Sequence, residues 1–169
     1  LAYLRKRGLT EESVARFGLG YAPPKGDGLV AFLARHGGAP EEGVRAGVLA
    51  ERHGRFVDRL RHRLTFHIKD AFGRVVAFTG RALGEDGPKY LNTPETPLYK
   101  KSQVLYGIDL ARREIARRKQ AVIVEGYTDV MACHLSGVET AVATCGTAFG
   151  EEHIRVLRRL LMDASTFDG

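Results

Sequence analysis

Residues 121–127 read AVIVEGY and residues 140–146 read TAVATCG, and these two stretches decide the fold. Each is a short apolar run that leads into polar residues and a glycine, as a buried strand does where it enters a turn. Helical patterns follow them at about residues 128–135 and 151–162, and a further apolar stretch leads toward Phe167. This βαβαβ order predicts a parallel sheet with right-handed crossovers.

The helix predicted over residues 151–162 has one apolar face and one basic face. Its apolar stripe is formed by Ile154, Leu157, Leu160 and Leu161. Its basic side chains lie largely off this stripe and are Arg155, Arg158 and Arg159. This periodicity favours a helix that covers the sheet and keeps a solvated basic face.

The N-terminal residues predict several short helices. Residues 1–20 have a helix–turn–helix pattern in which Thr10 is a good N-cap for the second helix. Turn-forming residues at 23–28 end this segment, a further helix is expected over residues 29–35, and another begins near Pro40. Segments of this kind are typical of small surface helices that pack on a sheet.

Residues 56–68 change to a period of two, which predicts a strand. Apolar and basic side chains alternate, so one face is expected to be buried and the other to display a basic row of Arg59, Arg61, Arg63 and Lys69. Turn residues at 70–73 and the Val- and Phe-rich residues 74–79 then predict an antiparallel hairpin.

Residues 84–97 are dense in Gly, Pro, Asn and Thr, which predicts a loop. This loop carries Lys89, Tyr90 and Asn92, and Lys101 follows it closely. A loop of this kind can hold functional groups over a scaffold.

Together these patterns predict a mixed α/β fold with two parts. An N-terminal α/β subdomain with an antiparallel hairpin is expected over residues 1–118, and a partial parallel βαβαβ sheet over residues 119–169. At 169 residues and 44% hydrophobic composition, the chain can bury one good-sized core or two small ones.

The composition narrows the partners and the location. Lys and Arg outnumber Asp and Glu by 26 to 20, which favours a polyanionic partner, although charge alone leaves an ordinary mildly basic protein equally open. No apolar run approaches the roughly 20 residues of a membrane span, so no membrane partner and a cytoplasmic location are expected. Cys133 and Cys145 lack metal-ligand spacing and are expected to be buried, reduced thiols.

Carboxylates occur where two of the predicted strands end, namely Glu125 after the first and Asp168 after the third. Because the carboxyl ends of parallel strands meet at one sheet edge, these two are expected to converge. Asp129 is either a third member of the cluster or an ordinary helix-start residue. Clustered carboxylates suit Mg²⁺ or Mn²⁺ that carries nucleotide phosphates, which implies metal-assisted phosphoryl transfer, with ordinary capping as the open alternative.

Longer stretches of the sequence resemble a known family. Residues 122–130 (VIVEGYTDV), residues 141–148 (AVATCGTA) and Phe167-Asp168-Gly169 resemble the Toprim domain of DnaG-type primases. Four earlier segments are similar to the basic subdomain that precedes Toprim in primases: YLRKRGLT at residues 3–10, RFGLGYAP at 16–23, DRLRHRLTF at 58–66 and PKYLNTPET at 88–96. Toprim alone is shared by several enzyme classes, but this combination is specific to primases, so the chain is identified as a member of that family.

The resemblance implies roles for the acidic residues. Glu125 is similar to the essential Toprim glutamate, which would coordinate metal or act as general acid or base on the attacking 3′ hydroxyl. Asp168 is similar to the first aspartate of an Asp-x-Asp pair and would hold Mg²⁺ or Mn²⁺ against the nucleotide phosphates. The second aspartate of that pair would fall one residue beyond Gly169, and Asp129 is a secondary member of the same cluster.

The resemblance also implies a basic groove for template DNA or nucleotide phosphate, formed by Arg59, Arg61, Arg81, Lys89 and Lys101. Tyr90 and Asn92 resemble positions near the nucleotide, although Tyr90 is equally explained as an anchor that packs the loop. For any single arginine a solvated strand face is the simpler explanation, and the grouping with the lysines favours the groove.

Three residues depart from the family pattern. His67 stands where a proline is usual, Thr79 where a glycine is usual, and Gly150 where a hydroxyl residue commonly caps the helix. They weaken the expected strand geometry and capping rather than the assignment. The histidines have no ligand spacing, so metal or base roles are not expected for His53, His62, His67 and His134.

Family membership implies synthesis of RNA primers on single-stranded DNA during replication, from ribonucleoside triphosphates and through an RNA–DNA hybrid. A zinc-binding domain and the regions that meet the replicative helicase and single-strand-binding protein are expected outside these residues. The ends at Leu1 and Gly169 indicate an excised piece, expected to be weakly active or inactive by itself.

Two alternatives stay open at this point. The first is a non-catalytic module that binds single-stranded DNA. The second is another Toprim enzyme, a nuclease or a topoisomerase subunit, for which Tyr127 would be the nucleophile candidate, although packing explains Tyr127 better.

Overall fold

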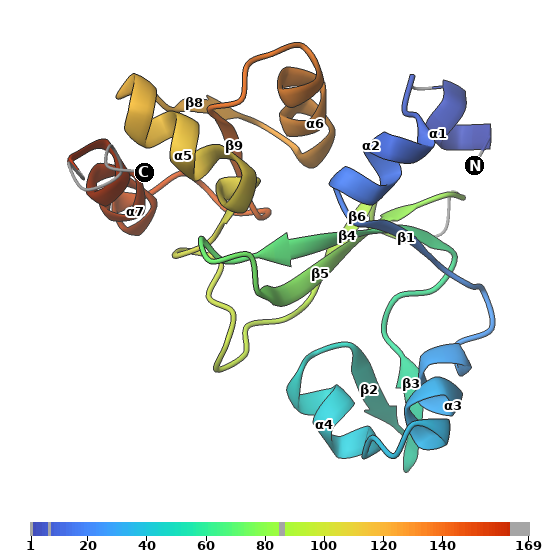
Figure 1. Ribbon diagram of the computed structural model, residues 1–169. Helices are drawn as coiled ribbons and strands as arrows, with labels where there is room; N and C mark the ends of the chain where they lie inside the picture. The colour runs from blue at the N-terminus through green and yellow to red at the C-terminus, as the bar shows by residue number, and fades with distance from the viewer. Residues whose placement is uncertain (1, 7, 85–86, 163–169) are drawn as a thin grey trace. The chain divides into compact units, whose positions relative to one another are not determined.

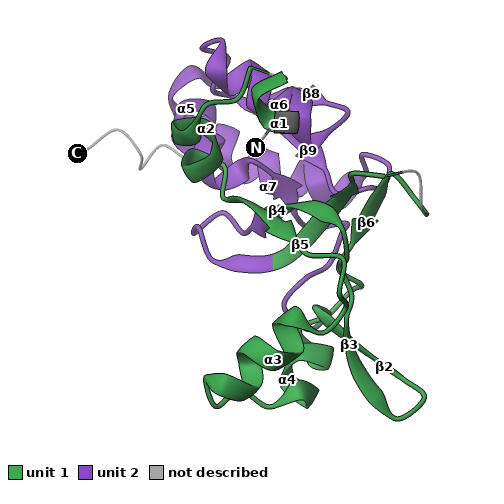
Figure 2. Ribbon diagram, turned by 90° about the vertical axis from the view of Figure 1, so that its right-hand side faces the viewer, with its two compact units in different colours: residues 1–67, 77–96 green, residues 68–76, 97–169 purple. Residues whose placement is uncertain are grey.

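The structure is a computed structural model of the chain, and it describes residues 2–6, 8–84 and 87–162. The chain forms two compact units, which are coloured separately in Figure 2. Unit 1 comprises Leu1–His67 and Ala77–Thr96, and unit 2 comprises Ile68–Val76 and Pro97–Gly169. The mixed α/β fold is confirmed (Figure 1), whereas the domain boundary expected after residue 118 stays a prediction.

Unit 1 begins with short helices at the expected places. They are α1 (Ala2–Lys6), α2 (Glu11–Arg16), α3 (Gly28–Arg35) and α4 (Pro40–Arg45). The Thr10 side chain accepts a hydrogen bond from the Ser13 backbone N–H at 3.2 Å, so Thr10 caps α2 as predicted.

A four-stranded sheet has the strand order β1-β4-β5-β6. Most of its residues belong to unit 1, whereas Ile68–Val76, where β4 leads into β5, belong to unit 2. Its strands are β1 (Leu19–Ala22), β4 (Arg63–Lys69), β5 (Val75–Ala82) and β6 (Tyr90–Asn92). β1 pairs antiparallel with β4, and β6 pairs antiparallel with β5. The apolar side chains of β4 are buried on one face, led by Phe66 and Ile68.

The hairpin predicted between β4 and β5 is confirmed. The Asp70 backbone N–H donates to the Arg74 carbonyl at 3.0 Å. The Asp70 carboxylate accepts from the backbone N–H groups of Phe72 and Arg74 at 2.9 and 3.0 Å. A side chain that pairs with its own turn in this way stabilises the reversal of the chain.

A second hairpin of unit 1 pairs β2 (Leu49–Arg52) with β3 (Arg55–Asp58) beside α3 and α4. Asp58 is buried at the end of β3, and its carboxylate accepts from the Leu29 and Val30 backbone N–H groups at 2.8 and 3.1 Å. These are otherwise unsatisfied donors of the first turn of α3, so a residue distant in sequence caps that helix.

Unit 2 contains a three-stranded sheet of order β7-β9-β8. Its strands are β7 (Leu105–Tyr106), β8 (Val122–Val124) and β9 (Ala141–Thr144), and its helices are α5 (Ile108–Arg118), α6 (Tyr127–Leu135) and α7 (Glu151–Met162). β8 and β9 are parallel as predicted, but β7 runs antiparallel to β9, so the sheet is mixed rather than purely parallel. The third strand expected toward Phe167 lies outside the described residues.

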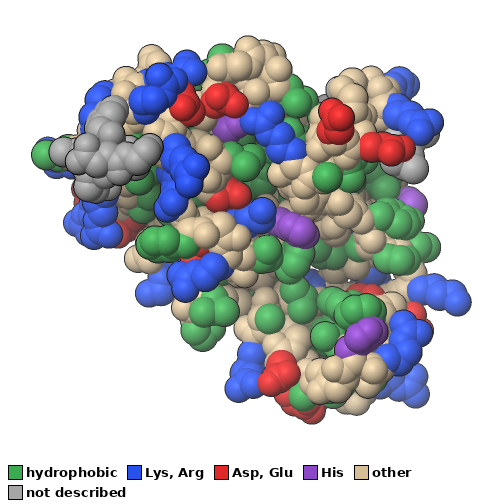
Figure 3. Space-filling view, in the orientation of Figure 1, with side chains coloured by type: hydrophobic (Ala, Val, Ile, Leu, Met, Phe, Trp, Pro, Cys, Tyr) green, Lys and Arg blue, Asp and Glu red, His purple; other side chains and the backbone are tan. Residues whose placement is uncertain are grey.

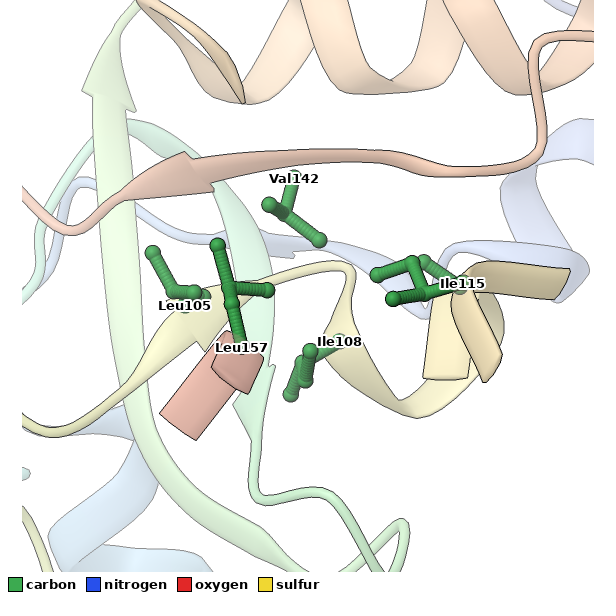
Figure 4. Close-up of a cluster of buried hydrophobic side chains, with 6 residues drawn as sticks. Leu105, Ile108, Ile115, Val142 and Leu157 are labelled. Carbon is green, nitrogen blue, oxygen red and sulfur yellow. The ribbon is translucent and has the colours of Figure 1, made fainter. Parts of the chain in front are cut away.

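One apolar cluster holds unit 2 together (Figure 4). Leu105, Ile108, Ile115 and Val142 come from β7, α5 and β9, and Leu157 reaches them from α7. Burying side chains of this size contributes about 1.5–3 kcal/mol each relative to leaving them exposed.

The long strand predicted over residues 56–68 is wrong. The chain leaves β3 at Asp58 and enters β4 only at Arg63, and His62 between them has a φ of 49°. A continuous strand cannot include a residue with positive φ, so the alternation of side chains does not run through this segment.

The apolar stripe predicted on α7 is wrong at one end. Leu157 is buried, but Ile154 is 49% exposed, and His153 is buried in its place. A polar ring occupies the core-facing position because both its nitrogens have hydrogen-bond partners, which the hydropathy pattern does not register.

Several elements have no counterpart in the sequence-based expectations. They are β1, β2, β7 and α5, together with β6 inside the predicted loop. Both cysteines are free, but only Cys145 is buried as expected, because Cys133 is partly exposed. No helix in the described ranges 2–6, 8–84 and 87–162 has the length and apolarity needed to cross a membrane.

Candidate active site and nucleic-acid groove

The predicted acidic residues that the structure describes lie where β8 leads into α6. Glu125 directly follows β8 and is exposed to solvent. Gly126 is the N-cap of α6, with φ −146° and ψ 170°, and Asp129 lies in the first turn of the helix and is also exposed. A Cβ atom at position 126 would lie 3.3 Å from Asp129 Oδ2, so the missing side chain of Gly126 leaves the carboxylate close to the backbone.

The parallel pairing of β8 with β9 brings their carboxyl ends to one edge of the sheet. Thr144 ends β9 there, and its hydroxyl donates to the Thr147 carbonyl at 2.6 Å, which closes the following turn. Cys145 comes next and is fully buried. Burial raises the pKa of the Cys145 thiol to about 11 and outweighs its contacts with Tyr99 and Tyr127, so this thiol is not nucleophilic near neutral pH.

Tyr127 is buried, and its ring packs edge to face on Tyr106 with centroids 4.9 Å apart. This environment agrees with a packing role for Tyr127 rather than that of a nucleophile.

The acidic edge offers oxygen ligands of the kind that Mg²⁺ and Mn²⁺ take. Glu125 and Asp129 are exposed, so a hydrated cation can reach both carboxylates. In the part of the chain that the structure describes, no three His, Cys, Asp or Glu side chains form a metal-binding group. The donor set therefore fits part of a hard-cation site, and Asp168, the third expected member, lies outside the described residues.

A basic groove of about 630 Å³ lies in unit 1, with Arg59, Arg61, His62 and Arg63 in its lining. We call these residues, together with Pro24, Gly87 and Leu91, the basic groove. In the space-filling view, Lys and Arg side chains occur in several groups separated by other surface, not in one continuous patch (Figure 3). A groove of this size with several cations suits a phosphate backbone.

The three arginines of the groove differ in their surroundings. Arg61 is exposed, and its side chain lies against Gly26, whose φ of 48° and missing Cβ make room for it. Arg63 is only 6% exposed and donates to the Gly80 and Pro88 carbonyls at 3.0 and 2.9 Å. Burial lowers the pKa of the Arg63 guanidinium.

Arg63 and Lys69 therefore do not belong to a solvated basic row, contrary to expectation. Arg63 is committed to two backbone carbonyls. Lys69 and Asp109 both belong to unit 2, and the Lys69 ammonium lies 3.6 Å from the Asp109 carboxylate. Arg59 is partly buried and has a distinct environment of its own, since its Nε is buried without a hydrogen-bond partner among the described residues.

Four other predicted residues lie on or beside the pairing of β5 with β6. Arg81 lies directly opposite Tyr90, and Thr79 opposite Asn92. The centroids of the Tyr90 and Phe66 rings lie 6.5 Å apart, so Tyr90 packs toward this core residue. Lys89, just before β6, is exposed, and its carbonyl accepts from the Ala82 N–H.

Lys101, the remaining predicted residue, belongs to unit 2 and is partly exposed. Its carbonyl accepts a hydrogen bond from His153 Nε2 at 2.8 Å. His153 Nδ1 in turn accepts from the Gly150 backbone N–H at 3.2 Å. The His153 side chain therefore caps the N-terminus of α7 and ties this helix to the Lys101 segment.

Sequence reasoning did not single out His153. The signal for it was the departure at Gly150, where a capping hydroxyl is missing: the third residue of α7 supplies the capping group in its place. Such a cap would be found by looking for a polar side chain three residues after a poor N-cap.

Comparison with known proteins identifies the family. The family described as DNA primase catalytic core, N-terminal domain, matches residues 1–112, and the Toprim domain matches residues 119–165. A DNA primase of Streptomyces coelicolor is 53% identical over 176 residues, which cover 99% of this chain and 28% of that protein.

Solved structures agree. The RNA polymerase domain of Mycobacterium tuberculosis primase DnaG, in complex with a double-stranded DNA oligomer with a 6-nucleotide overhang, superposes with a TM-score of 0.93 at 51% identity and covers 99% of this chain and 53% of that one. A DnaG primase catalytic domain bound to single-stranded DNA superposes with a TM-score of 0.83 at 44% identity. The match covers 94% of this chain and 50% of that domain. The chain thus spans about a quarter of the curated relative and half of each solved domain, and it belongs to the DnaG primase family as part of the catalytic core.

Proposed function

We propose that this chain supplies part of the site at which a DnaG-type primase synthesises RNA primers on single-stranded DNA by metal-dependent nucleotidyl transfer. The observation that carries the proposal is the exposed Glu125 at the carboxyl end of β8, in a chain that combines the primase N-terminal domain with Toprim. An exposed carboxylate at this edge can reach both a cation and a nucleotide.

The acidic residues have distinct proposed roles. Glu125 would hold the metal or take the proton from the attacking 3′ hydroxyl, and Asp168 would hold the metal against the nucleotide phosphates. Asp129, in the first turn of α6, is the secondary acidic member. Mg²⁺ or Mn²⁺ bound by these carboxylates would neutralise the charge of the phosphates.

The basic residues are proposed to hold nucleic acid or nucleotide phosphate. Arg59 and Arg61 belong to the basic groove, Arg81 and Lys89 lie on the β5–β6 side of unit 1, and Lys101 lies in unit 2. Tyr90 and Asn92 are proposed to lie near the nucleotide, and the packing of Tyr90 toward Phe66 also supports its alternative role as an anchor of this segment.

The partners follow from the family and from the relatives solved with DNA. We propose a single-stranded DNA template, ribonucleoside triphosphates and the growing RNA–DNA hybrid as direct partners. The replicative helicase, the single-strand-binding protein and any zinc site are assigned to other parts of the full-length protein. The proposed place of action is the replication fork in the cytoplasm.

The central experiment measures RNA synthesis from ribonucleotides on single-stranded DNA by the full-length protein with Mg²⁺ or Mn²⁺. We expect Glu125→Ala to lower synthesis by at least about a hundredfold while DNA binding stays unchanged. Glu151→Ala is the matched control, because Glu151 is also an exposed glutamate of unit 2 but lies in the first turn of α7. Synthesis retained in Glu125→Ala would overturn the role of Glu125.

The same assay tests the basic residues. Arg81→Ala is expected to raise the nucleotide or template concentration needed for half-maximal synthesis, since a cation that holds phosphate is lost. The isolated 169-residue chain is expected to be weakly active or inactive, and metal-dependent primer synthesis by it at the full-length rate would contradict this.

A further inference from the structure

A second cavity lies in unit 1 beside the basic groove and has a different character. It encloses about 250 Å³, and its walls include Tyr21, Leu29, Val48, Leu60 and Phe78. We call it the apolar pocket. A drug-sized ligand usually fills roughly 300–1,000 Å³, so this pocket suits a single ring system.

Arg59 lines both the apolar pocket and the basic groove. The neighbouring residues continue the two linings, with Pro23 and Leu60 on the pocket and Pro24 and Arg61 on the groove. The two cavities therefore adjoin along the same two chain segments, and a polymer in the groove can place one substituent in the pocket.

The polar groups of the pocket define what it accepts. Arg59 Nε is buried without a hydrogen-bond partner among the described residues, whereas the Arg59 backbone N–H donates to the Val48 carbonyl at 3.0 Å. A buried N–H without an acceptor is unfavourable because it has lost its hydration, so a ligand that offers an acceptor to Arg59 gains affinity.

The second polar group, Asp58, rejects anions. Asp58 lines the pocket, and each of its carboxylate oxygens accepts from one backbone N–H group, those of Leu29 and Val30. A phosphate next to this buried negative charge would be repelled. The occupant is therefore a neutral, flat ring with a hydrogen-bond acceptor on its edge.

We propose that the apolar pocket receives a nucleobase of the single strand that lies in the basic groove, with the base held between apolar walls and accepting from Arg59 Nε. Every base has apolar faces and at least one edge acceptor, so the contact tolerates sequence. The proposal rests on the proposed binding of template strand in the groove and names the subsite that would hold one base.

The test compares binding of two single-stranded oligomers of equal length to the full-length protein, one of thymidines and one entirely abasic. Val48→Phe fills the pocket and is expected to reduce the preference for the base-bearing oligomer by about tenfold, with the salt dependence unchanged. Val44→Phe is the control, because Val44 lies exposed on α4 outside the pocket and the preference should stay at the wild-type value.

A conservative variant covers the case in which Val48→Phe misfolds. Arg59→Lys keeps the charge in the groove but removes Nε–H, so it is expected to lower the base preference while the salt dependence stays unchanged. An unchanged preference in folded Arg59→Lys and Val48→Phe would overturn the proposal.

Two further arms separate the possible failures. If the full-length protein binds neither oligomer, the proposed template binding fails, and the pocket assignment fails with it. The second outcome concerns free thymidine monophosphate. If Val48→Phe weakens its binding while both variants keep the wild-type oligomer preference, the pocket binds the base of a free nucleotide. The proposal that the base belongs to the bound strand is then overturned.

Discussion

The two units carry their charged residues in opposite ways. In unit 2, Glu125 and Asp129 are exposed around a sharp strand-to-helix turn. In unit 1, Arg61 is exposed while Arg63, two residues later, is buried and bonded to two carbonyls. The exposure of the acidic residues therefore follows from a local motif, whereas the environment of each arginine depends on what the fold places beside it.

The environment of a charged residue can be predicted from the sequence only where neighbouring residues determine it. A strand followed by Glu-Gly and a helix start is a local arrangement, so the exposure of Glu125 follows from the segment itself. The alternation of Arg59, Arg61 and Arg63 is also local, but the positive φ of His62 breaks it. Equal spacing then leads to unequal environments.

The largest effect is expected for the contrast between Arg63 and Arg61. Arg63→Ala should lower the free energy of unfolding by about 3 kcal/mol, because the buried Gly80 carbonyl and the less buried Pro88 carbonyl both lose their donor. Arg61→Ala should change it by less than about 0.5 kcal/mol and should instead weaken DNA binding. Urea denaturation and a DNA titration measure the two quantities, and equal destabilisation by both substitutions would remove the contrast.

A similar contrast exists on α7 in unit 2. Leu157→Ala should lower the free energy of unfolding by about 2 kcal/mol, because Leu157 packs in the apolar cluster of Figure 4. Ile154→Ala should stay within about 0.5 kcal/mol, since Ile154 is exposed. The midpoints of urea denaturation compare the two variants. A larger loss of stability for Ile154→Ala than for Leu157→Ala would support the apolar stripe predicted from hydropathy.

Two threonines of unit 1 are expected to respond with opposite signs. Thr79 is fully buried, and its hydroxyl has no hydrogen-bond partner among the described residues, so Thr79→Val should raise the free energy of unfolding by about 1 kcal/mol. The Thr93 hydroxyl accepts from the Phe78 N–H and donates to the Phe78 carbonyl, so Thr93→Val should lower it by about 1 kcal/mol. Shifts of the same sign in thermal unfolding would contradict this pair.

The smallest effect concerns the thiols of unit 2. Burial raises the pKa of Cys145 from 9.0 to about 11, so the folded state keeps its proton while the unfolded state loses it. The stability from this group is complete below about pH 9 and is lost as the pH rises toward 11.

At pH 8 a thiol-alkylating reagent should modify the partly exposed Cys133 much faster than Cys145. Mass spectrometry would measure the two rates, and equal rates would argue against burial of Cys145.

Much of the secondary structure follows from local patterns. Features that depend on neighbouring residues or on regular periodicity are predictable from the sequence. They include the Thr10 cap, the Asp70 turn, the two helices after β8 and β9, and the parallel pairing of those strands. The antiparallel β7 and the short β1 and β6 were not predictable in this way. Strands of two to four residues are specified by their partners rather than by a pattern of their own.

Motifs and periodicity act over short ranges, so they are enough to predict the family, the α/β class and the position of Glu125 after a strand. The structural role of Arg63, the cap that His153 forms on α7 and the place of Arg59 beside an apolar pocket become visible only in the folded chain. They depend on hydrogen-bond partners and burial that come from segments distant in sequence. Gly80, Pro88 and Lys101 supply carbonyls to residues that no local pattern connects to them.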